Sequence, residues 1–171
     1  MNNIEQYITE YGKDIYSFCV YLTGSRDLAD DLYQQTFLVA IEKGGIDGNN
    51  NPKSFLLSVA VNVWRNMRRR LFFRRSRTEY VFTDDQNSFD IADPSPDGEE
   101  LAVIRERNDE IRRAVMELPE KMRQVVILFY TEDMKINEIA EILRISEGTV
   151  KSRLHNAKKK LRERLEHYER L

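Results

Sequence analysis

EIAEILRISEGTVKSRLHNAKKKL, residues 138–161, contains two helix patterns joined by a short turn, and its Lys and Arg residues are concentrated in the second. In the first pattern, the small residue Ala140 stands where two crossing helices would approach closely. The Ile145 side chain is expected to be buried at the turn, and Ser146 can cap the second helix through its side-chain oxygen. The predicted buried side consists of Ile139, Ala140, Leu143, Val150, Leu154, Ala157 and Leu161. This arrangement is typical of a helix-turn-helix.

The second helix of this pair has a polar and basic outer face. With Val150 and Leu154 directed inward, a rotation of about 100° per residue fixes which side chains point outward. These are Ser152, His155, Asn156 and Lys159, with Thr149, Lys151, Arg153 and Lys158 on the flanks. Asn and Arg can read base edges in the DNA major groove, while Lys and Thr can hold phosphates. We predict DNA contact rather than a merely solvated basic face, because turn, cap and basic face coincide.

The net charge of -2 hides a strong variation along the 171 residues. Residues 61–80 hold seven Arg and one Glu, a local charge of +6. Residues 81–100 hold seven acids and no base, and residues 147–171 have a charge of +4. Two basic segments that lie on helices indicate a polyanionic partner, because phosphate contacts release condensed counterions.

Apolar residues recur at helical spacing through most of the chain. A first helix spans about residues 4–22, and Ser25 can cap a second that runs to about residue 43. The segment from Gly44 to Pro52 is rich in Gly and Asn and is expected to be a loop. A third helix follows, with an apolar stripe formed by Leu56, Ala60, Val63, Met67 and Leu71.

Helical periodicity is lost in the acidic segment that contains Pro94 and Pro96, and returns at Leu101. Pro119 then stands where a further helix, EKMRQVVILFY, can start. No segment alternates with a period of two over a useful length. The predicted fold is all-α, with two small helical domains, residues 1–76 and 101–171, joined by a flexible acidic linker, residues 77–100. The second domain contains the helix-turn-helix.

Two exposed stripes are predicted in the first domain. In the second helix, an inward face of Ala29, Tyr33, Thr36, Phe37 and Ala40 leaves Asp27, Asp31, Gln34 and Leu38 on the opposite side. An apolar Leu38 among acids and an amide indicates a protein interface, against the alternative of a solvated face with one stray Leu. In the third helix, Ser58, Asn62, Arg65 and Arg69 lie opposite the apolar stripe. Arg can hold phosphates or stack on an unpaired base, and Asn can bond a base edge. Trp64 is expected in the core.

The chain resembles the bacterial sigma factors of the extracytoplasmic-function (ECF) group of the sigma-70 family. LPEKMRQVVILFYTEDMKINEIAEILRISEGTVKSRLHNAKKKLRERL is similar to their region four, and DLADDLYQQTFLVA to a motif of their region two. SFLLSVAVNVWRNMRRR is similar to the helix that follows. Region four alone also occurs in response regulators, whereas both blocks in this order are specific to the family.

The resemblance implies a sigma factor that directs core RNA polymerase to promoters and assists their opening, in a stress response. Core polymerase would bind Asp27, Asp31, Gln34 and Leu38, with the clamp helices of its β′ subunit as the partner and β as a further contact. The minus-ten element would bind Ser58, Asn62, Arg65, Arg68 and Arg69. The minus-thirty-five element would bind Thr149, Lys151, Ser152, Arg153, His155, Asn156, Lys158 and Lys159.

The family resemblance also implies promoter DNA and a membrane-linked anti-sigma factor as partners. The sequence shows no signal peptide and no apolar stretch of about 18 residues, which predicts a cytoplasmic protein, nucleoid-associated within holoenzyme. Three residues depart from the family pattern. Arg144 stands where Gly is usual, which predicts a left-handed conformation costing about 1 kcal/mol. Lys135 replaces a Ser or Thr cap, and Gln35 replaces a Glu.

Two other functions fit the sequence less well. A conventional helix-turn-helix regulator that does not bind polymerase would leave the stripe of Asp31, Gln34 and Leu38 without a purpose. An enzyme, for instance a metal nuclease, would need carboxylates fixed on rigid elements, whereas the acidic cluster lies in a Pro-containing linker. His155 and His167 have no ligand partner at metal-binding spacing, and the single cysteine, Cys19, is expected to be a buried thiol. We therefore expect no catalytic residue, metal, cofactor or small-molecule substrate.

Overall fold

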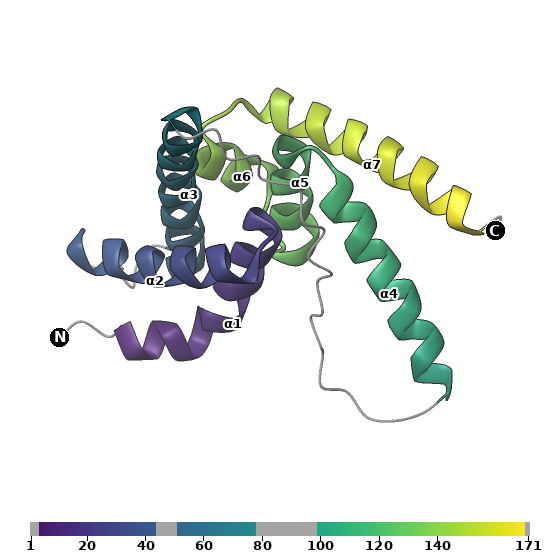
Figure 1. Ribbon diagram of the computed structural model, residues 1–171, viewed down its shortest axis with the longest axis horizontal. Coiled ribbons are helices and arrows are strands. Elements are labelled where there is room, and N and C mark those ends of the chain that lie inside the picture. Colours follow the sequence, from purple (N-terminus) through teal and green to yellow (C-terminus); the bar gives the residue numbers. More distant parts are fainter. Residues whose placement is uncertain (1–3, 44–50, 78–98, 170–171) are drawn as a thin grey trace. The chain divides into compact units, whose positions relative to one another are not determined.

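The computed structural model describes residues 4–43, 51–77 and 99–169, and its elements are shown in Figure 1. The predicted loop at residues 44–50 and most of the predicted linker, residues 78–98, lie outside the described residues. Within the described ranges every regular element is a helix, which confirms the predicted all-α fold. The helices are α1 (Ile4–Thr23), α2 (Arg26–Glu42), α3 (Pro52–Arg77), α4 (Glu99–Glu117), α5 (Glu120–Val126), η1 (Ile127–Thr131), α6 (Ile136–Leu143) and α7 (Glu147–Glu169).

Contacts divide the chain into two compact units. The first comprises residues 1–88 together with residues 140–144, and the second comprises residues 89–139 and 145–171. Helices α1, α2 and α3 thus belong to one unit, and α4, α5, η1 and α7 to the other. Within each unit, amphipathic helices bury their apolar faces against their neighbours. Residues 140–144, at the end of α6 and the start of the turn, are grouped with the first unit, so the division does not follow the helix patterns alone.

The first unit has its core where α1 and α2 lie side by side and α3 crosses them (Figure 1). Ile15, Phe18 and Leu22 of α1 are fully buried, as are Leu32 and Ala40 of α2. The first half of α1 packs less well, and Ile8 remains 41% exposed. The apolar side of α1 therefore enters the core only from the middle of the helix onward.

Two helix starts in this unit follow from capping side chains. The Leu28 N–H donates to Ser25 Oγ at 3.5 Å, which confirms the predicted cap of α2. The Ser54 N–H donates to Asn51 Oδ1 at 3.2 Å, and Pro52 is the first residue of α3. The expectation that the loop extends through Pro52 is therefore wrong by one residue, because proline is well suited to a first helical position.

The buried face of α3 differs from the predicted stripe. Leu56 and Ala60 are buried as predicted, but Leu57, Val61 and Trp64 are buried as well. The remaining members of the stripe, Val63, Met67 and Leu71, are only half-buried. Apolar residues occupy most sides of this part of the helix, so spacing alone could not fix its rotation. The prediction of a core Trp64 is confirmed.

Helix α5 is central to the second unit and contacts both α4 and α7. Gln124, Val125, Val126, Ile127 and Leu128 are all buried, so the helix is covered on several sides. The predicted continuous helix widens into the π-helical turn η1, where the Glu132 N–H donates to Ile127 O at 3.0 Å. The sequence pattern did not predict this widening.

A buried carboxylate ties α4 to α7. Glu110 of α4 is 5% exposed, and its Oε1 lies 2.8 Å from Arg164 Nη1. The same guanidinium donates through Nε to Glu117 Oε2 at 2.9 Å. One arginine thus pairs with two acids of α4 and holds the second half of α7 against it.

We expect Arg164→Met to lower the free energy of unfolding by about 1–3 kcal/mol, because it leaves the buried Glu110 carboxylate poorly compensated. Arg162→Met, at an exposed position of the same helix, is the matched control and should change stability by at most about 0.5 kcal/mol. Urea unfolding followed by circular dichroism measures both. Equal effects of the two substitutions would contradict a structural role for the ion pair.

Cys19 is fully buried in α1, as predicted, and burial raises the pKa of its thiol to about 12. Its thiolate form is therefore almost absent at neutral pH. In the folded chain at pH 8, we expect a thiol reagent to label Cys19 at least tenfold more slowly than in 6 M urea. The labelling rate is measured from the absorbance of the thiolate that the reagent releases. Comparable labelling rates in both conditions would show that α1 does not bury the Cys19 thiol.

Candidate nucleic-acid interface

The outer face of α7 has the arrangement expected from the sequence. Val150, Leu154 and Ala157 are buried, and Leu161 is half-buried. Six of the eight predicted DNA-binding residues are exposed: Lys151, Ser152, His155, Asn156, Lys158 and Lys159. Thr149 and Arg153 are half-buried on the flanks. A continuous row of hydrogen-bond donors therefore faces away from the buried side of this helix.

The turn before α7 is fixed by a cap and by a left-handed residue. The Thr149 N–H donates to Ser146 Oγ at 3.1 Å, which confirms the predicted cap. The two hydroxyl oxygens of Ser146 and Thr149 lie 2.9 Å apart and share a hydrogen bond, so the Thr149 hydroxyl is already engaged. Arg144 has φ 55°, the left-handed conformation that its place in the turn predicts.

The start of α6 is capped in a way that the sequence did not reveal. Lys135 has no side-chain oxygen to offer, but its own N–H donates to Glu138 Oε2 at 2.8 Å. This is the reciprocal half of a capping box. Ile139, Ile142 and Leu143 of α6 are buried, whereas Ile145 is only half-buried in the turn.

Lys158 is held at the edge of the outer face of α7. Its Nζ lies 5.8 Å from the ring centroid of Tyr130 in η1, at cation–π distance. The Tyr130 side chain is itself 55% exposed. The pair therefore presents a positive charge beside an aromatic ring. The sequence pattern predicted a helix over EKMRQVVILFY but did not predict that Tyr130 is exposed.

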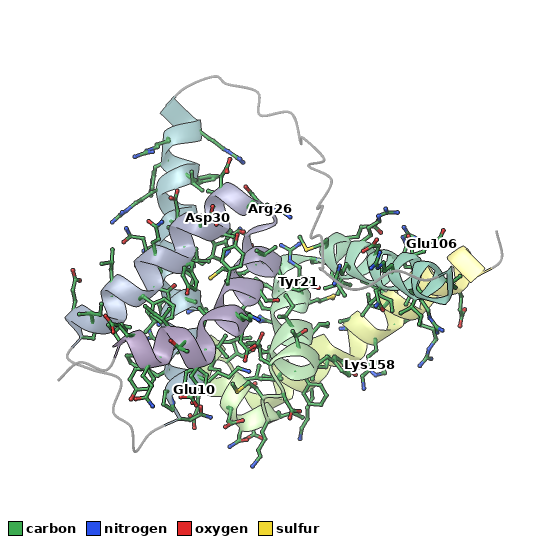
Figure 2. All side chains as sticks on the ribbon, turned by 90° about the horizontal axis from the view of Figure 1, so that it is seen from below. Glu10, Tyr21, Arg26, Asp30, Glu106 and Lys158 are labelled. Atoms are coloured by element: carbon green, nitrogen blue, oxygen red, sulfur yellow. The ribbon has the colours of Figure 1, made fainter. Side chains whose placement is uncertain are left out.

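The predicted DNA-binding residues of α3 differ in exposure, and one of them, Arg65, donates through Nη2 to Leu143 O at 2.7 Å. Ser58, Asn62 and Arg65 are half-buried, and Arg68 and Arg69 are exposed. The end of the helix extends beyond α1 and α2 (Figure 2). No acidic residue occurs between Arg65 and Arg77, so this part of the helix carries a positive charge in its own sequence.

The predicted polymerase-binding residues share one exposed face of α2. Asp27, Asp31 and Gln34 are exposed, and Leu38 is 52% exposed. Ile41, one turn further on, is 37% exposed and extends the apolar end of this stripe. The sequence reading missed Ile41, although its spacing of three from Leu38 was a usable signal.

The neighbouring Asp30 has a different role. The Tyr16 hydroxyl of α1 donates to Asp30 Oδ1 at 2.8 Å, and this hydrogen bond raises the pKa of Tyr16. Asp30 thus joins α1 to α2 at the surface. Asp27 and Asp31, the acids of α2 predicted to meet a protein partner, are exposed, as is Glu42 at the end of the helix.

The described residues contain no candidate metal site and no candidate membrane-spanning helix. In that part of the chain, no three His, Cys, Asp or Glu side chains are grouped so that they could hold a metal ion. None of the described helices combines the length and apolarity needed to cross a membrane.

The backbone conformation of Arg144 should favour Gly over Ala at this position. Its φ of 55° strains any residue with a Cβ, so we expect Arg144→Gly to be more stable than Arg144→Ala by about 1 kcal/mol. Both variants lose the same guanidinium, so their difference isolates the backbone. Urea unfolding of the two variants measures it, and an Ala variant as stable as the Gly variant would contradict the strain.

Comparison with known proteins agrees with this geometry. Sequence models of Sigma-70 region 2 and Sigma-70 region 4 match residues 7–72 and 108–161. The ECF RNA polymerase sigma factor SigX of Bacillus subtilis is 31% identical over 160 residues, which cover 91% of this chain and 80% of SigX. SigW of the same organism is 30% identical over 163 residues, covering 91% of this chain and 84% of SigW.

Two solved structures have the same fold at lower identity. The sigma factor RpoE from Bartonella quintana, in complex with the anti-sigma factor NepR, has a TM-score of 0.76 at 20% identity and covers 97% of this chain and 98% of its own. CnrH, in complex with the cytosolic domain of CnrY, has a TM-score of 0.60 at 20% identity and covers 96% of this chain and 88% of its own. The two region matches and the curated relatives together establish that this chain belongs to the ECF RNA polymerase sigma factors of the Sigma-70 family.

Proposed function

We propose that this protein binds bacterial core RNA polymerase, directs it to specific promoters and assists their opening. The observation that carries the proposal is the presence of two different surfaces in one chain. An acidic and apolar face lies on α2 of the first unit, and a basic helix-turn-helix face lies on α7 of the second. A duplex DNA-binding regulator needs the second surface and has no use for the first.

The face of α2 suits a helical protein partner. Asp27, Asp31 and Gln34 offer charge and hydrogen bonds around the exposed Leu38 and Ile41. Interfaces commonly combine an apolar centre with a polar rim, and a few apolar anchors supply most of the binding energy. We assign this face to the β′ subunit of core polymerase, with further contacts to β.

The faces of α3 and α7 suit two parts of a promoter. On α7, Asn156 and Arg153 can bond base edges while Lys151, Lys158 and Lys159 hold phosphates, as expected for a duplex minus-thirty-five element. Ser152, Thr149 and His155 complete that face. On α3, Ser58, Asn62, Arg65, Arg68 and Arg69 combine amide, hydroxyl and guanidinium groups that can hold the bases and phosphates of the minus-ten element.

The action of such a protein places it in the cytoplasm, where polymerase and promoter DNA are found, and on the nucleoid once it has joined the polymerase. We further propose regulation by an anti-sigma factor, linked to the membrane and released under stress. The proposal is supported by the two solved neighbours, which are complexes with an anti-sigma factor and with the cytosolic domain of CnrY. Capture of a membrane protein by the tagged chain from its own cells, in competition with core polymerase, tests this regulation.

The proposed function predicts that the purified chain co-elutes with bacterial core polymerase in size-exclusion chromatography. Transcripts that the mixture makes from fragmented genomic DNA should begin at discrete sites that share two upstream motifs. Sequencing of the transcript ends measures this. Duplex DNA binding without co-elution would instead indicate a conventional helix-turn-helix regulator and refute the sigma activity.

Substitutions on the two surfaces separate the two binding steps. Asp31→Ala with Leu38→Ala should weaken association with core polymerase at least tenfold, whereas Lys13→Ala, exposed on α1, should not. Asn156→Ala should leave association intact and reduce promoter-specific transcription by about 5- to 100-fold, as expected for the loss of one base contact. Lys121→Ala, exposed on α5, is the matched control in the second unit.

A further inference from the structure

Tyr130, the exposed aromatic residue of η1, lies beside α7 but outside the helix-turn-helix. Its side chain is 55% exposed, whereas Ile127 and Leu128 of the same turn are buried. The Phe129 ring packs edge-on against the Tyr130 ring, with the two centroids 5.0 Å apart and an interplanar angle of 81°. The Tyr130 ring is therefore supported from within its own unit while much of its surface remains in water.

The π-helical turn η1 brings Tyr130 to the surface. In this turn the Glu132 N–H donates to Ile127 O, five residues back along the chain, at 3.0 Å. The residues at the two ends of this hydrogen bond, Ile127 and Glu132, are both buried, and Tyr130 is exposed between them. Single π-turns inside α-helices occur frequently at functional sites. The position of Tyr130 is therefore a reason to ask what its side chain contacts.

Lys158 connects Tyr130 to the outer face of α7. The Lys158 Nζ lies 5.8 Å from the Tyr130 ring centroid, where the ring attracts the ammonium group. At about 100° per residue, Lys158 shares one flank of α7 with Lys151 and His155, and all three side chains are exposed. The ring and hydroxyl of Tyr130 therefore continue the candidate DNA face along this flank, from α7 onto η1.

Tyr130 and Lys158 together offer two kinds of hydrogen-bond donor to an anion. Lys carries a compact charge on a flexible four-carbon stem, and a stem that is already ordered loses less conformational entropy on binding. The ring lies on one side of the Lys158 ammonium group, which has three N–H donors. The Tyr130 hydroxyl adds a neutral donor at the edge of the same ring. Phosphate oxygens of DNA accept hydrogen bonds from both Lys and Tyr side chains.

We propose that Tyr130 and Lys158 form a phosphate-binding pair beside the helix-turn-helix, in which the ring holds the Lys158 ammonium group and the Tyr130 hydroxyl donates to the same phosphate. The ligand is the backbone of the duplex that α7 enters, on the flank of Lys151 and His155. The inference rests on the proposed function, because it adds a contact from η1 to the minus-thirty-five surface. Phosphates carry no base identity, so the pair sets affinity and the orientation of α7 rather than sequence preference.

An apolar protein partner and a purely structural role fit the pair less well. An apolar surface would bury the Lys158 ammonium group without an anion, which costs desolvation free energy. A contact that served only to join η1 to α7 would be expected to bury the ring, whereas more than half of the Tyr130 side chain is exposed. Three consecutive lysines, residues 158–160, also favour a polyanion, and interfaces with DNA are commonly hydrated.

The test measures the affinity of the full chain, assembled with core polymerase, for two DNA duplexes. One duplex carries the upstream motif identified by transcript sequencing, and the other carries the same bases in scrambled order. Tyr130→Phe keeps the ring and removes the hydroxyl, so it should weaken binding to both duplexes at least about threefold, as expected for one hydrogen bond to a charged group. Asn156→Ala, which removes a proposed base contact, should instead weaken binding mainly to the motif.

The salt dependence of binding separates the two members of the pair. Lys158→Gln removes one charge and should lower the slope of log affinity against log salt by about 1, whereas Tyr130→Phe should leave this slope unchanged. In a Tyr130→Leu background, which lacks the ring, Lys158→Gln should weaken binding about twofold less than in the unchanged chain. Val103→Ala shortens a 68% exposed side chain of α4 in the same unit and should change none of these quantities.

Three results would overturn the inference. The first is binding of both duplexes by Tyr130→Phe at the affinity of the unchanged chain, and the second is an unchanged salt slope for Lys158→Gln. The third is loss of co-elution with core polymerase in Tyr130→Phe while the free chain still binds duplex DNA, which would assign the ring to a polymerase contact. Tyr130→Phe keeps the packing against Phe129, so its circular dichroism spectrum should match that of the unchanged chain.

Failure of the inference can be told apart from failure of the proposed function. If the chain does not join core polymerase, the proposed sigma activity is refuted, and a duplex of arbitrary sequence is then titrated with the chain alone at low salt. Weaker binding of that duplex by Tyr130→Phe would still support the phosphate contact. Unchanged binding by this variant, or no binding by the unchanged chain, would refute it.

Discussion

The direction of α7 depends on the short turn between Leu143 and Glu147. In this turn Arg144 adopts a left-handed conformation and Ser146 accepts a hydrogen bond from the Thr149 N–H. The first feature ends α6 and the second starts α7, so the chain cannot continue as one straight helix. The burial of Val150, Leu154 and Ala157 then fixes which side of α7 faces outward. The turn and this apolar side together produce the basic surface.

Sequence periodicity predicted the helices, the two helical groups and the exposed residues of α2 and α7. It succeeded there because each of those helices has a single apolar side, as in the run from Val150 to Ala157. It failed to place the buried face of α3, where Leu57 and Trp64 compete with Val63 and Met67 for the core. It also missed the π-helical turn at Ile127, because the widening depends on how the central helix is covered on several sides.

The surfaces differ in how much free energy it costs to expose them to water. The buried residues of α2 and α7 lie opposite their polar faces, so neither surface requires the core to be rearranged. The candidate contacts of α7 are polar and hydrated, and exposing them costs little. Phe72 and Phe73 of α3, and Val103 and Ile104 of α4, are different, because the exposure of these apolar pairs is unfavourable in water.

The arginines in the last turns of α3 affect the stability of the end of this helix. It has 26 residues, about 39 Å, and its last turns carry arginines at spacings of three and four that repel one another. An anion that neutralises these charges removes that repulsion and so favours the helical form. By thermodynamic linkage, the helical form then binds the anion more tightly than a frayed form does. Higher ionic strength or a bound polyanion should therefore extend the helical part of the end of α3.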